Sequence, residues 1–148
     1  MSAERSSPMS AERSSQRRRA RFALEEVLAW KDGVAKDAAT RAQGLPIELR
    51  AQGLSTAVAV LMREGRQGRQ PSLALARLLS KWLLREADPR PLADGAEGDA
   101  DRGSGDPTPR ALLEASIRAP RTSYLAAQAE ALALLDHVKL LARAIHGK

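Results

Sequence analysis

The final segment of the chain constrains the fold most strongly, because residues 124–145 have the pattern of one long helix. Its apolar residues recur at intervals of three, four and seven positions, which places them on one helix face: Tyr124, Ala131, Leu135, Val138, Ala142 and Ile145. Leu132, Leu134 and Leu141 widen this stripe. We expect Thr122 to cap the start of this helix and Gly147 to end it. A rod about 33 Å long with such a stripe must pack against other helices.

The composition extends this prediction to the whole chain. There are 28 alanines and 21 leucines, which favour helix, against five valines, three isoleucines and four threonines. At 148 residues the chain is long enough for one real core, and without cysteine it has no disulfide. We therefore expect an all-α fold, a compact bundle of five to seven helices in a single domain. No apolar run approaches the roughly 20 residues that span a bilayer, so we expect a cytoplasmic protein with no membrane partner.

Polar and Gly- or Pro-rich stretches divide the chain into a tail, a series of helices and an insertion. Residues 1–7 recur as residues 9–15, and we expect residues 1–14 to form a disordered tail before a helical domain at 15–148. A stretch rich in Gly, Pro, Asp and Ala predicts a flexible acidic insertion at 88–106. In the first half of the chain, the apolar spacing predicts a helix from Arg17 to Asp32–Gly33, a short helix ending at Ala42, and a helix at 46–50 closed by Gly53. Beyond Gly53 it predicts a helix at 54–63, a helix opened by Pro71, and a helix from Pro107 or Pro109 to Ile117.

The charge balance suggests a polyanionic partner. The formal net charge is +6, and 19 of the 24 basic residues are arginine, which suits bidentate phosphate contacts. A GC-rich coding sequence would produce the same bias. On the expected first helix, Arg17 and Arg21 are neighbours four positions apart and Arg18 flanks them, a row that could meet phosphates along a strand. The alternative is an ordinary solvated first turn.

Catalytic and metal-binding patterns are missing from the sequence. His137 and His146 are nine positions apart, on opposite faces of the final helix, so they cannot share a metal ion. Glu25 and Glu26 fit a solvated helix edge better than an acid/base pair. The glycines at 65–69 lack a phosphate-loop pattern, and 99–110 lacks the glycine and glutamate of a calcium loop. We therefore predict no enzyme, no cofactor, no metal site and no small-molecule substrate.

Four segments, in this order, resemble the small subunit of the Cmr-type (type III-B) CRISPR RNA-guided effector complex. They are the basic opening at 16–27, the Pro-led turn and helix at 45–61, the Leu-Ser-Lys-Trp-Leu element at 79–83, and Tyr124 with the closing run at 130–144. Together they extend from about Gln16 to Ile145 and leave out the acidic insertion.

The resemblance implies a non-catalytic helical subunit that stacks in several copies along the guide RNA and its target RNA, beside other effector-complex subunits. Its basic side chains would neutralise backbone phosphates without reading bases. Trp82 and Tyr124 are expected to be core or interface anchors. The alternative is a helical protein–protein adaptor with no nucleic-acid binding. The residues we expect to contact RNA phosphates are Arg17, Arg18, Arg21, Arg50, Lys81, Lys139 and Arg143.

Overall fold

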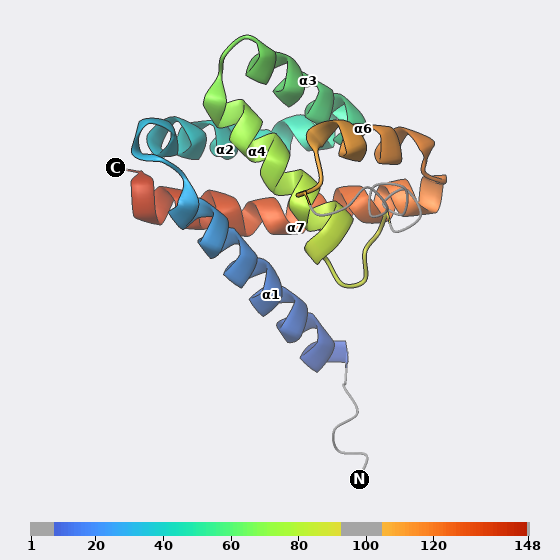
Figure 1. The fold of residues 1–148 in the computed structure, drawn as a ribbon. Helices are drawn as coiled ribbons and strands as arrows, with labels where there is room; N and C mark the ends of the chain where they lie inside the picture. Colours follow the sequence, from blue (N-terminus) through green and yellow to red (C-terminus); the bar gives the residue numbers. More distant parts are fainter. Residues whose placement is uncertain (1–7, 93–104, 148) are drawn as a thin grey trace.

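Six α-helices make up most of the structure, a computed structural model that describes residues 8–92 and 105–147 (Figure 1). The described residues contain no strand, so the predicted all-α class and the five to seven helices are confirmed. The elements are α1 (Pro8–Ala29), α2 (Asp32–Gln52), α3 (Leu54–Arg66), α4 (Gln70–Lys81), a π-helical segment η2 (Trp82–Glu86), α6 (Pro109–Arg118) and α7 (Arg121–His146).

Helices α1 and α2 pack along the long α7 (Figure 1). Helix α2 runs antiparallel to it: Gln43 donates a hydrogen bond to the Lys139 carbonyl, and the Leu54 amide after α2 donates to Gln128. Helix α1 crosses α7 and contacts the end of α4, while α3, α4 and α6 pack against one another and α4 packs on α2. This arrangement buries one continuous core between the layers, whose largest fully buried side chains are Leu45, Leu49, Leu54, Leu61, Leu75, Leu78, Leu79, Leu83, Leu112, Leu134 and Leu135.

The apolar stripe of α7 is largely where the sequence placed it. Ala131, Leu135, Val138 and Ala142 are fully buried, whereas Ile145 at the end of the stripe is 39% exposed. Gly147 follows the helix as its C-cap, as predicted, and its amide donates to the Arg143 carbonyl. The prediction that Thr122 caps α7 was wrong, because the helix already begins at Arg121, after Pro120.

Helix α2 contradicts the predicted end of a short helix at Ala42, because it continues to Gln52. It runs unbroken through Pro46, although a proline inside a helix costs about 3 kcal/mol. Burial offsets that cost, because Leu45 and Leu49 are fully buried and each contributes about 1.5–3 kcal/mol. Arg41 also bridges the proline turn, with its guanidinium 2.7 and 2.9 Å from the two Glu48 carboxylate oxygens. The predicted helix at 46–50 is therefore only the last part of α2.

Gly53 ends α2, as predicted, for a clear steric reason. Its φ of 91° lies in the region that favours glycine, and a Cβ there would lie 2.8 Å from the Tyr124 hydroxyl oxygen. That hydroxyl accepts a hydrogen bond from the Ser55 amide at the start of α3. Tyr124 is therefore an anchor between α7 and the α2–α3 junction.

Helix α1 begins earlier than the sequence predicted. It starts at Pro8, so the part of the expected tail at 8–14 is helical, while residues 1–7 lie outside the described residues. Glu12 supports this first part, since it accepts a hydrogen bond from Gln16 at 3.0 Å and lies 3.9 Å from an Arg19 nitrogen.

The middle of the chain follows the predicted order with altered boundaries. Helix α3 extends to Arg66 rather than residue 63, and Pro71 lies in the first turn of α4. Helix α6 begins at Pro109, where the Thr108 side chain caps the Ala111 amide, and ends one residue after Ile117. Most of the acidic insertion, residues 93–104, lies outside the described residues. At its two ends Leu92 is buried in the core and Asp106 is ion-paired.

A polar cluster joins three elements beside the core, and we call Arg19, Phe22, Trp82 and Glu130 the Glu130 cluster. The Glu130 carboxylate on α7 accepts two hydrogen bonds from the Arg19 guanidinium of α1, at 2.7 and 3.0 Å. It also accepts one from the Trp82 indole at 2.8 Å. The Phe22 and Trp82 ring centroids are 5.0 Å apart. The prediction that Trp82 is a core residue is confirmed, since it is 3% exposed.

We expect Glu130→Gln to lower the free energy of unfolding by about 2–4 kcal/mol, because it leaves the half-buried Arg19 charge without its counter-ion while conserving volume. Chemical denaturation measures this change. The matched control is Glu114→Gln, whose partner Arg110 is 81% exposed at the side chain and which should cost at most about 0.5 kcal/mol. Equal effects for the two variants would contradict the structural role of the cluster.

Candidate nucleic-acid interface

The N-terminal half of α1 projects from the bundle (Figure 1). Its side chains from Ser10 to Ser14 are exposed, whereas Ala23 and Val27 further along are buried against the core. Successive helix residues are turned by about 100°, so burial of Ala23 and Val27 directs Arg17 and Arg21 away from the core. The predicted basic opening is therefore a basic helix surface.

Three of the predicted arginines meet on this surface. Arg17, Arg18 and Arg21 are exposed and, with Ser14, line one open hollow on α1. The Arg18 guanidinium donates to the Glu86 carbonyl oxygen at 2.8 Å, a neutral acceptor that leaves the positive charge uncompensated. Among the described residues, no carboxylate pairs with any of the three arginines. The hollow is therefore a concentration of free positive charge that suits phosphate oxygens.

Arg19, within the same run, has the opposite role. Its hydrogen bonds to Glu130 raise its pKa, and the charges of Glu130 and Glu12 raise it further against the opposing effect of burial. The positive charge of Arg19 is therefore compensated inside the protein by Glu130. Because of their positions around the helix, Arg19 faces the bundle whereas the other three arginines are exposed.

The other four predicted residues do not join this surface. The Lys81 ammonium lies 2.7 Å from Glu26, in an ion pair in which both side chains are about one-fifth exposed. Arg50 is exposed in the last turn of α2, beside the N-terminal half of α7. Lys139 is half-buried and Arg143 is exposed, both in the C-terminal half of α7. The seven predicted residues therefore form one cluster of three and several separate positions.

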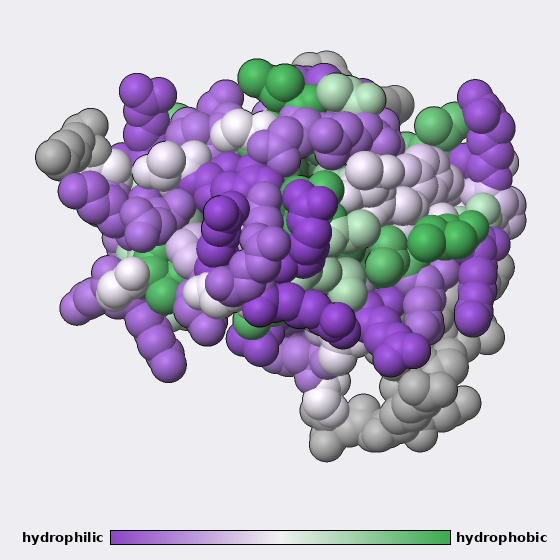
Figure 2. All heavy atoms as spheres, turned by 90° about the horizontal axis from the view of Figure 1, so that it is seen from above, coloured by the Kyte–Doolittle hydropathy of each residue, from purple (hydrophilic) through white to green (hydrophobic). Residues whose placement is uncertain are grey.

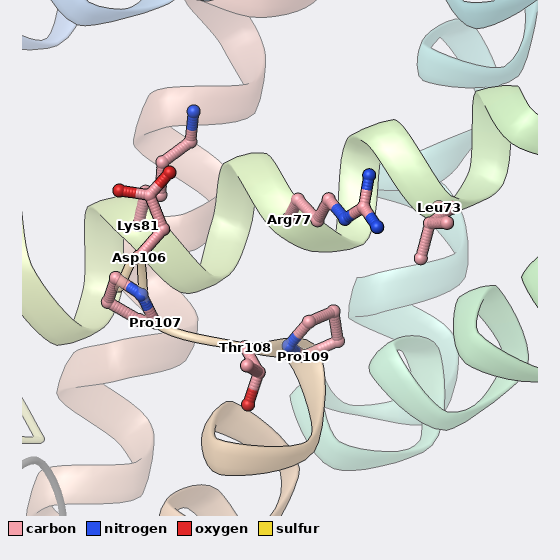
Figure 3. A pocket seen from close by; sticks show the side chains of 7 residues that line it. All are labelled: Leu73, Arg77, Lys81, Asp106, Pro107, Thr108 and Pro109. Atoms are coloured by element: carbon pink, nitrogen blue, oxygen red, sulfur yellow. The ribbon is translucent and has the colours of Figure 1, made fainter. Parts of the chain in front are cut away.

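Sequence reasoning missed a second basic hollow, between α4 and the α1–α2 turn. Trp30, Lys31, Arg77 and Lys81 line it, together with Glu26 and four apolar or uncharged residues. The signal available in the sequence was Trp30, two residues before Asp32 at the predicted break, but the hollow itself forms only when α4 packs beside that turn. Arg77 and Lys81 also line an adjoining hollow on the other side of α4, bordered by residues 106–109 (Figure 3).

The two histidines contact α1 separately. The His137 Nε2 lies 2.7 Å from the Gln16 side-chain oxygen, and the His146 Nε2 lies 3.0 Å from the Val27 carbonyl oxygen. Burial lowers the pKa of His137, the Arg19 charge lowers it further, and Asp136 acts in the opposite direction. In the described part of the chain, no group of three or more His, Cys, Asp or Glu residues is placed to hold a metal ion. None of the described helices is both long and apolar enough to cross a membrane.

Comparison with known protein families identifies the family of this chain. The profile described as CRISPR-associated protein (Cas_Cmr5) matches residues 15–145, most of the chain. The chain belongs to the Cas_Cmr5 family. It is thus a Cmr-type (type III-B) CRISPR-associated small subunit, and the resemblance found in the sequence is confirmed. Cas_Cmr5 membership also makes it part of a multi-subunit Cmr effector complex. No curated protein and no solved structure matches the chain.

The attachment of α1 to α7 in this Cas_Cmr5 chain should weaken on acidification. The folded-state pKa of His137 lies below its ordinary value of about 6.5, so its contribution to stability is present above that pH and is lost as the pH falls through the folded-state pKa. Urea midpoints at about pH 7.5 and about pH 5.5 measure the loss. His137→Gln is the control, because other titrating groups affect both proteins. We expect the wild type to lose more stability than His137→Gln, and an equal loss would contradict the assignment.

Proposed function

We propose that this chain is a non-catalytic small subunit that binds RNA backbone and stacks along the guide and target RNA of the type III-B effector complex. The observation that carries the proposal is the hollow of Arg17, Arg18 and Arg21, which lies on a helix that projects from the bundle. Its position in the family's basic opening agrees with this role. In the proposal the protein's partners are guide RNA, target RNA, other complex subunits and further copies of itself, in the cytoplasm.

The mechanism follows from the charge and its exposure. Arginine side chains neutralise phosphates and release counter-ions, which gives an affinity that depends on salt and tolerates any sequence. An arginine row four residues apart repeats about every 6 Å along a helix, so several phosphates of one strand can be contacted at once. In the hollow itself, Arg17, Arg18 and Arg21 are joined only by Ser14, so it offers cations for phosphate oxygens and no carboxylate.

The alternative function is a helical adaptor that binds protein and no nucleic acid. One observation favours it: Leu28, Ile47, Ile117 and Leu140 are 60–67% exposed, which is unusual for large apolar side chains. A subunit of a large complex needs such protein contacts in either case. Hydrophilic side chains nevertheless cover most of the face seen in Figure 2, and hydrophobic ones appear in several patches between them.

Changing Arg17, Arg18 and Arg21 together to alanine should weaken binding to single-stranded RNA and reduce the slope of log affinity against log salt by about 2. The measurement is a salt titration of RNA binding, by the isolated chain and by the assembled complex. The matched control removes three exposed arginines of α6 and of the start of α7, Arg110, Arg118 and Arg121.

The two variants carry the same net charge, so a general charge effect would weaken both equally and would contradict a specific α1 interface. Absence of any RNA affinity in the wild type at about 50 mM salt, with and without partner subunits, would contradict RNA binding altogether and favour the adaptor.

A further inference from the structure

We propose that the hollow between α4 and the α1–α2 turn binds one nucleotide unit of single-stranded RNA, with the base on the Trp30 indole and the phosphate on Arg77 and Lys31. This inference rests on the proposed function, because it identifies a second contact for the same RNA. It assigns a role to Trp30 and Arg77, neither of which belongs to the α1 arginine cluster.

The hollow combines an aromatic surface with excess positive charge. Trp30 is partly exposed and lines it, while Lys31 and Arg77 are exposed at its edge. The Trp30 ring centroid lies 6.1 Å from that of His146, which holds the indole between the bundle and the hollow. Base stacking on an aromatic ring together with phosphate contacts to cations is the general means by which proteins bind single strands.

The charges in the hollow leave Arg77 free for a ligand. The only carboxylate that lines it among the described residues, Glu26, is already paired with Lys81 at 2.7 Å. In the adjoining hollow, Asp106 is paired with Arg85 at 2.6 Å. Figure 3 shows the Arg77 guanidinium pointing along α4 toward Leu73 and away from Asp106. Among the described residues, Arg77 has neither an ion pair nor a hydrogen bond through its side chain, and it borders both hollows.

The Trp30 hollow also lies close enough to Arg17, Arg18 and Arg21 for one RNA strand to contact both. Arg18 contacts Glu86 and Glu26 contacts Lys81, so one flank of α1 runs beside η2 and α4 along its length. Ala29, on that helix, lines the hollow. Eleven residues separate Arg18 from Ala29 in the sequence, which is about 17 Å along a helix, a distance that a few nucleotides span. One strand can therefore contact the α1 arginines and Trp30 together.

Tryptophan emission gives a direct readout, because the chain has two tryptophans and Trp82 is 3% exposed. The probe is a short oligouridylate, titrated into the full-length chain at about 50 mM salt. We expect RNA to quench the wild-type emission and the quench to disappear in Trp30→Phe, which retains a stacking ring. Trp30→Ala should weaken binding about tenfold, and Arg77→Ala about three- to tenfold.

Controls make each outcome decisive. Arg77 is exposed, so Arg77→Ala tests the site even where Trp30→Ala is destabilised, and Arg118→Ala is its matched control at the other end of the molecule. A quench that persists in Trp30→Phe, or wild-type affinity in Arg77→Ala, would overturn the inference. So would a polyglutamate peptide that competes with the RNA and quenches as strongly, since the site would then bind acidic peptides.

The inference and the proposed function fail in different ways. If RNA binding depends on the α1 arginines but is unchanged in Trp30→Ala and Arg77→Ala, this hollow is not a site and the proposed function stands. If the wild-type chain and the assembled complex bind no RNA, both are overturned.

Discussion

The position of α1 depends on one carboxylate. Glu130 on α7 accepts hydrogen bonds from Arg19 of α1 and from Trp82 at the end of α4, so three elements are fixed relative to one another at a single point. Among the described residues, α1 buries only three apolar side chains, Phe22, Ala23 and Val27, so its polar contacts to α7, α4 and η2 carry much of its attachment. Since a half-buried charge needs its partner, the cluster specifies one rotation of α1 about its axis.

That rotation also determines the surface charge. Consecutive residues of a helix point about 100° apart, so anchoring Arg19 on Glu130 turns Arg17, Arg18 and Arg21 away from the interior. A run of arginines thus supplies both the structural contact and the exposed cations. Arg41 is a comparable anchor elsewhere, since it joins Glu48 of α2 to Glu64 at the end of α3, and Ser72 of α4 donates to the same Glu64.

Local signals in the sequence predicted those features that depend on a few neighbouring residues. The helical class, the buried stripe of α7, the turn at Gly53 and the burial of Trp82 all follow from spacing and residue type. The predicted helix end at Ala42 was wrong because the cost of Pro46 is local, whereas its compensation comes from Leu45 and Leu49 packing against other helices. The pairing of Lys81 with Glu26 joins residues 55 positions apart and has no local signal.

The candidate site also has one part set by neighbouring residues and one part set by long-range packing. The α1 cluster was predictable because its members are sequence neighbours on one helix. The hollow at Trp30 was not, because its walls come from the α1–α2 turn and from α4, which only the packed bundle brings together. The RNA-binding roles of all these residues remain predictions, as do the tail at 1–7 and the insertion at 93–104.

The exposed apolar residues and the exposed arginines fit one assembly only if they serve different partners. Leu28, Ile47, Ile117 and Leu140 lie on four different helices, so several helices offer apolar side chains to protein partners. These side chains are 60–67% exposed, and burying the remainder of each would contribute about 1–2 kcal/mol, which favours a chain that works inside a complex. The exposed arginines without a carboxylate partner are not stabilised by such apolar contacts, and an anion is the partner that suits them. In the proposed role, subunit contacts therefore set the position of the chain, and α1 and α4 present its positive charge to the RNA.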